Sequence, residues 1–160
     1  MAKKRGTPSF QEAIETAEHL KLVVGLGAIK RSEGAGQIDT GAANLQGSVA
    51  MDDDCRSAYP TSARWDYVIG TRRQRGDVAY FVEVHSAETS EVSKMTAKLD
   101  WLMEFLARDQ QAPLARLQRA VHWIASGRIN IPKHTRQYKL LKTTLAQRGL
   151  IGPSKQLTLE

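Results

Sequence analysis

The chain has 160 residues, the length of one ordinary domain, which can bury a sizeable core without disulfides or metal staples. Cys55 is the only cysteine, which excludes an intramolecular disulfide and a thiolate zinc cluster. The net charge of +6 favours an anionic partner, and we expect that partner to be nucleic acid.

The sequence contains no internal repeat and no interior linker, so we expect residues 1–160 to form a single domain, with residues 1–7 as a flexible basic tail. No apolar segment follows this tail, and no apolar run approaches the roughly 18 residues of a membrane span. These features predict a cytoplasmic protein without a membrane partner. A homodimer is left open, because the sequence does not decide the oligomeric state.

Apolar residues near the start of the chain recur at helical spacing, which predicts a helix over about residues 8–24. Thr7 would be its N-cap, with Pro8 at the first helical position. Five glycines then punctuate residues 25–41, which we expect to form loops along the edge of the domain.

The next segments have the composition of strands. Residues 45–51 predict a first strand, and the aspartates at 52–54 follow it. Two further runs, residues 64–70 and residues 80–85, are rich in β-branched and aromatic side chains. They flank the basic segment 71–77, so we expect a β-hairpin with an arginine-rich turn.

The midpoint of this hairpin sets which residues face each other. If the midpoint lies between Gln74 and Arg75, Asp66 pairs directly across from Glu83. His85 then lies on the same face as Glu83, because side chains along a strand alternate with a period of two. Two facing carboxylates repel each other unless a cation or a proton lies between them. The pair therefore predicts a metal site.

A buried stripe from Val92 to Leu106, at alternating steps of three and four residues, predicts a second helix. Thr89 or Ser90 would cap it, and Glu91 in its first turn matches the helix dipole.

Beyond this helix, residues 120–126 predict a fourth strand and residues 135–148 a third helix, which Gly149 would end. Residues 156–159 predict a final edge strand. The expected order is α-β-β-β-α-β-α-β, which is an α/β arrangement of helices against a mixed sheet.

This order, with Asp66 on the second strand and Glu83 on the third, resembles the PD-(D/E)xK nuclease superfamily, whose core is α-β-β-β-α-β. The family's aspartate matches Asp66, its acidic residue matches Glu83, and the last position of its motif falls on His85. The resemblance implies a restriction endonuclease-like fold, a mixed sheet flanked by helices, with an extra C-terminal helix and edge strand beyond the core.

The chemistry that the resemblance implies is metal-dependent hydrolysis of phosphodiester bonds in DNA or RNA, with Mg²⁺ or Mn²⁺ as cofactor. Asp66, Glu83 and the backbone carbonyl of Val84 would hold the ion. The ion would polarise a phosphoryl oxygen and lower the pKa of a bound water. Asp52 or Asp53 would be a further acidic group, although the three aspartates are more simply explained as a helix N-terminal cluster. Glu15 on the first helix is another candidate.

Two positions depart from the family pattern. Trp65 stands where the family has proline, and His85 stands where it has lysine. His85 would act as a general base or orient the attacking water, or it is a partly buried structural histidine. Lys98 or Lys94, on one flank of the second helix, would supply the missing ammonium group.

Four basic residues are expected to contact nucleic-acid phosphates, or otherwise to form a solvated surface. They are Arg72, Arg73 and Arg75 of the hairpin turn, and Lys94. The alternative function is a catalytically inactive nuclease-like module that binds nucleic acid or a protein partner. A purely structural interaction protein would show neither metal binding nor salt-dependent affinity for nucleic acid.

Overall fold

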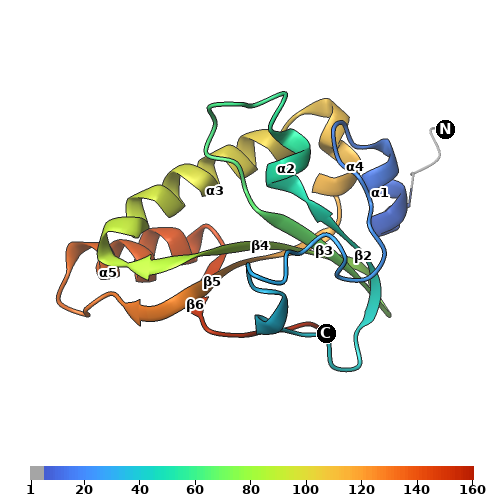
Figure 1. The fold of residues 1–160 in the computed structure, drawn as a ribbon. Coiled ribbons are helices and arrows are strands. Elements are labelled where there is room, and N and C mark those ends of the chain that lie inside the picture. The colour runs from blue at the N-terminus through green and yellow to red at the C-terminus, as the bar shows by residue number, and fades with distance from the viewer. Residues whose placement is uncertain (1–5) are drawn as a thin grey trace.

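A five-stranded mixed sheet forms the centre of the protein in the computed structural model, which describes residues 6–160 (Figure 1). The predicted basic tail falls mostly outside these residues. The strand order is β2-β3-β4-β5-β6, in which β2, β3 and β4 are antiparallel neighbours and β5 and β6 run parallel to β4. The strands are β2 (Asn44–Ala50), β3 (Tyr67–Arg73), β4 (Gly76–Glu88), β5 (Gln118–Asn130) and β6 (Leu150–Ser154).

The helices lie together on one face of this sheet (Figure 1). They are α1 (Phe10–Thr16), α2 (Met51–Cys55), α3 (Val92–Leu106), α4 (Ala112–Ala115) and α5 (Arg136–Leu140). A single apolar cluster fills the space between helices and sheet, with Phe81 and Trp123 from the strands and Leu99 from α3. None of the helices in the described part of the chain is long and apolar enough to cross a membrane. The predicted α/β class, a mixed sheet flanked by helices, is confirmed.

The other face of the sheet is covered by loops. Ile29 and Leu157 pack there on a second apolar cluster that includes Ile69 and Tyr80. A small two-stranded sheet joins these loops, since β1 (Ile38–Asp39) pairs in parallel with β7 (Leu157–Thr158). The 3₁₀ turn η1 (Ala35–Gln37) precedes β1.

The predicted hairpin is confirmed in position and in register. Tyr67 pairs with Val82 and Arg73 pairs with Gly76, so the midpoint lies between Gln74 and Arg75. The strands continue further toward the turn than predicted, and the loop has only two residues.

The second predicted helix is confirmed as α3, and the stripe from Val92 to Leu106 is buried against the sheet. Its predicted caps are wrong, because a 3₁₀ turn, η2 (Thr89–Glu91), precedes α3 and neither Thr89 nor Ser90 makes a side-chain cap bond. Two short elements then lead to β5: η3 (Asp109–Gln111) and α4, in which Pro113 lies in the first turn.

The first predicted helix is much too long. Ser9, rather than Thr7, caps α1 through a reciprocal capping box with Glu12, and the chain is already extended at Ala17. The chain beyond that point bends at residues 17–19 and is not helical, and Val23 forms a backbone bridge with Ser48 of β2. Tertiary pairing with the sheet thus overrides the helical spacing of these residues.

The helices and strands of the C-terminal region differ from those predicted. Thr135 caps α5, which continues as a π-helical stretch, η4 (Leu141–Leu145), and Gly149 follows with a φ of 96°. The main sheet then gains β6, an edge strand that was not predicted because Gly152-Pro153 is typical of a turn. The expected edge strand at 156–159 exists as β7, but it pairs with β1 and not with the main sheet.

Candidate functional site

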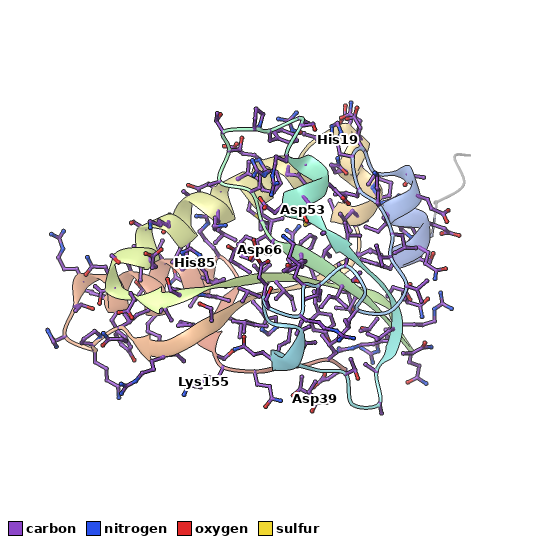
Figure 2. The ribbon with its side chains drawn as sticks, in the orientation of Figure 1. His19, Asp39, Asp53, Asp66, His85 and Lys155 are labelled. Carbon is purple, nitrogen blue, oxygen red and sulfur yellow. The ribbon has the colours of Figure 1, made fainter. Side chains whose placement is uncertain are left out.

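The two carboxylates predicted to face each other do so, at the point where β3 begins. Asp66 directly precedes β3, and the hairpin register continued by one residue places it across from Glu83. The backbone N–H of Asp66 donates to Glu83 Oε2 at 3.0 Å, and the N–H of Val84 donates to Asp66 Oδ2, also at 3.0 Å. Asp66 lies between the helix layer and the sheet (Figure 2). Each carboxylate is therefore fixed by the backbone of the opposite strand.

Lys98 completes this pair from the helix above it. Its Nζ lies 2.5 Å from Glu83 Oε1 and donates to the backbone carbonyl of Arg64 at 3.0 Å. The side chain of Glu83 is 1% exposed and that of Lys98 is 18% exposed, so the ion pair is shielded from water. Lys98 is one turn beyond Lys94 on α3, and of the two lysines considered from the sequence it is the one that reaches the carboxylates.

The segment before β3 is held rigidly, which fixes the carbonyl that Lys98 uses. Trp65 is fully buried in the core beneath the helices. The Arg64 guanidinium donates to Asp52 Oδ1 at 2.8 Å and to the carbonyl of Tyr59 at 2.6 Å. Trp65 thus anchors the chain next to Asp66.

Burial and mutual repulsion raise the pKa values of both carboxyl groups. Loss of solvent is the largest effect on Glu83, the charge of Asp66 adds to it, and together they raise the pKa of Glu83 to about 8 despite the nearby Lys98. Burial also raises the pKa of Asp66, with Lys98 and the Val84 N–H opposing the shift. In the absence of a bound cation, both carboxyl groups are therefore protonated more readily than ordinary carboxyl groups.

His85 shares the face of Glu83 but has a different partner. Its Nε2 lies 2.5 Å from Glu91 Oε2, and Lys94 Nζ lies 3.1 Å from the other oxygen of Glu91. Hydrogen bonds from His85 and Lys94 lower the pKa of Glu91. Within residues 6–160, His85 makes no hydrogen bond or ion pair to Asp66 or Glu83. The structure thus brings Lys98 to the carboxylate pair and leaves His85 and Lys94 on Glu91.

Other acidic residues surround a small hollow beside Asp66. Asp52 and Asp53 of α2 line it, as does Glu33 from the loop before β1, and Lys30 is the basic residue at its rim. The charges of Asp52 and Glu33 contribute to the raised pKa of Asp66. Each of these acids already has a cationic or hydroxyl partner: Arg64 for Asp52, Lys30 for Asp53 and Tyr67 for Glu33. They therefore form a polar surrounding for Asp66.

Glu33 was missed from the sequence. Its carboxylate accepts a hydrogen bond from the Tyr67 hydroxyl at 2.8 Å. The adjacent Gly34 has a φ of +100°, and a Cβ there would lie 2.8 Å from Val84 Cγ2, so only glycine lets this loop close onto β4. The feature of the sequence that could have pointed to Glu33 is the adjacent Gly34, because a glycine permits this close packing. Glu15, the other helical candidate, is an exposed residue of α1 with no contact to the pair.

The donor set is chemically suited to a hard divalent cation. Asp66 and Glu83 offer carboxylate oxygens, and Asp66 Oδ1 accepts no hydrogen bond from residues 6–160. Both oxygens of Glu83 are already engaged, one by Lys98 and one by the Asp66 N–H. Val84 contacts Asp66 through its N–H, and its carbonyl stays a predicted ligand. Among residues 6–160, no three His, Cys, Asp or Glu side chains are gathered as a metal-binding group.

The arginine turn lies far from this site. The seven residues of β3 separate the two, about 23 Å at roughly 3.3 Å per residue. Arg72 is paired with Asp77 at 3.3 Å, and Arg73 is paired with Glu160 at 2.8 Å, whereas Arg75 is exposed. The arginines and the carboxylate pair thus form two separate regions of the molecule.

No family model matches this chain, and comparisons with curated proteins and with solved structures gave no match either.

Proposed function

We propose that this protein is a metal-dependent phosphodiester hydrolase acting on DNA or RNA, built on a restriction endonuclease-like core. The observation that carries the proposal is the contact of 2.5 Å between Lys98 Nζ and Glu83 Oε1, opposite Asp66. It supplies, from α3, the ammonium group that the chain lacks at position 85. The order of α1, β2, β3, β4, α3 and β5 also supports the proposal, because it follows the α-β-β-β-α-β order of the PD-(D/E)xK core.

In this proposal Asp66 and Glu83 hold the cation, and Lys98 leaves Glu83 for the attacking water. A bound divalent ion would polarise a phosphoryl oxygen and lower the pKa of a coordinated water. The Lys98 ammonium would orient that water and stabilise negative charge on the phosphoryl group. The Arg64 carbonyl, fixed by the anchored segment 64–66, accepts a hydrogen bond from Lys98. This bond keeps Lys98 within reach of both Glu83 and the attacking water.

The test is metal-dependent cleavage of single-stranded DNA, duplex DNA and RNA by the full chain, with Mg²⁺ and Mn²⁺ supplied separately. We expect Asp66→Asn, Glu83→Gln and Lys98→Gln each to lower the cleavage rate by about 10²-fold or more, because each removes one charge at the reacting phosphate. Lys155→Gln is the matched control, since Lys155 is exposed and far from Asp66 (Figure 2). It should cleave like the wild type.

Thermal melting of each variant separates loss of activity from loss of fold. If the folded wild type cleaves none of the three substrates with either ion, the hydrolase proposal is wrong. The inactive nucleic-acid-binding module then becomes the better account. A Lys98→Gln variant with full activity would remove Lys98 from the mechanism and return the question to His85.

A further inference from the structure

A second polar hollow lies on the loop-covered face of the sheet, at the end of the strands away from Asp66. Its volume is about 530 Å³, and it lies over the ends of β3, β4 and β5. A neighbouring hollow that includes Arg75 shares Arg73, Gln118 and Glu160 with it, so the two are continuous. We call their combined lining the arginine hollow.

The arginine hollow exists because the sheet is unevenly covered here. The pairing of β6 with β5 begins only at Val121, so no strand of the described chain pairs with the outer side of residues 118–120 of β5. Val78 and Ala120 form a floor of small apolar side chains. The rings of Tyr80 and His122 stand at one side of this floor, with centroids 6.1 Å apart and planes inclined by 34°.

Positive charge is in excess in the arginine hollow. Arg73, Arg75 and Arg119 line it, and Glu160 is its only acidic lining residue among those described. Glu160 Oε2 lies 2.8 Å from Arg73 Nη2, whereas Arg75 and Arg119 form no ion pair within residues 6–160. One carboxylate thus already occupies an anion position, and two guanidinium groups have no anionic partner in the described chain.

The Tyr80 hydroxyl adds a hydrogen-bond donor to the arginine hollow, which also favours an anionic ligand. Its oxygen accepts the N–H of Arg73 Nη2 at 2.7 Å and the backbone N–H of Glu160 at 3.2 Å. The hydroxyl hydrogen therefore stays free for an acceptor on a ligand. Burial lowers the pKa of His122, which keeps that ring neutral near pH 7 and suited to packing against a planar group.

We propose that the arginine hollow binds a nucleotide, with its phosphate on Arg73, Arg75 and Arg119 and its base against His122 and the apolar floor. The part of it over β3, β4 and β5 has a volume of about 530 Å³, within the range of roughly 300–1,000 Å³ that small-molecule pockets occupy. Guanidinium groups match phosphate oxygens in charge and geometry, and aromatic rings are the usual platform for a base. The ligand displaces the Glu160 carboxylate from Arg73. This site is independent of the proposed hydrolase centre.

The experiment is calorimetric titration of the full chain with adenosine 5′-monophosphate and, separately, with a 5′-phosphorylated single-stranded DNA pentamer. Tighter binding of the mononucleotide identifies a free nucleotide as the ligand, and tighter binding of the pentamer identifies a strand; both support the site. We expect Arg119→Gln to weaken binding about tenfold, since it removes a charge-assisted hydrogen bond. Glu160→Gln should tighten binding, because it removes the competing carboxylate.

Arg128→Gln is the matched control, as it makes the same charge change at the opposite end of β5, outside the arginine hollow. It should bind like the wild type. Failure of the wild type to bind either probe overturns the proposal. Equal weakening by Arg119→Gln and Arg128→Gln also overturns it, because that result indicates diffuse charge attraction and not a site.

Discussion

At the scale of single residues, the raised pKa of Glu83 makes the stability of the fold depend on pH. Its pKa is raised to about 8, against about 4.3 for a glutamate in an unfolded chain. The folded state therefore binds this proton more tightly than the unfolded state. The resulting stabilisation is fully present below about pH 4 and is lost as the pH rises through 8.

Glu83→Gln should therefore flatten the fall of stability with pH. Glutamine resembles the protonated acid in shape and keeps no titrating group, so the variant should lose less stability than the wild type between pH 6 and pH 9. Urea denaturation of both proteins without divalent ions, at several pH values in this window, measures the effect. Parallel curves for the two proteins would show that Glu83 titrates normally in the fold.

At the scale of elements, close packing of α1 on β3 holds the hairpin beside the helix layer. A Cβ on Gly70 would lie 2.1 Å from Phe10 Cγ, and Phe10 is fully buried. We expect Gly70→Ala to destabilise the protein by about 1–3 kcal/mol through overpacking, measured by urea denaturation. Gly127→Ala in β5 is the control, since its Cβ would meet nothing within 4 Å. Similar losses in both variants would contradict this packing argument.

At the scale of the whole molecule, the net charge of +6 should give nucleic-acid binding that weakens with salt. Each phosphate contact with a duplex contributes about −0.9 to the slope of log K against log salt. Replacing Arg72, Arg73 and Arg75 with Gln should make the slope less steep. The change should be smaller than that expected for the loss of three phosphate contacts, because Asp77 and Glu160 already pair with two of these arginines. Fluorescence anisotropy over a salt series measures the slope. An unchanged slope would mean that the turn makes no phosphate contact.

The sequence by itself determined the features that depend on local chemistry. The predicted hairpin midpoint between Gln74 and Arg75 sets its register, and that register places Asp66 across from Glu83. The stripe from Val92 to Leu106 likewise defined α3, because side chains four residues apart must share one helix face.

Only the tertiary structure decided which cation meets the carboxylates and where the first helix ends. The sequence offered His85 as a general base and Lys98 or Lys94 as the source of the missing ammonium group. The way α3 crosses β4 leaves His85 on Glu91 and brings Lys98 to Glu83. Leu20 and Val24 continue the helical spacing, but Val23 between them pairs with Ser48 of β2, twenty-five residues away. Local spacing carries no information about contacts between distant segments, and these contacts supply most of the free energy that selects one arrangement of helices and strands.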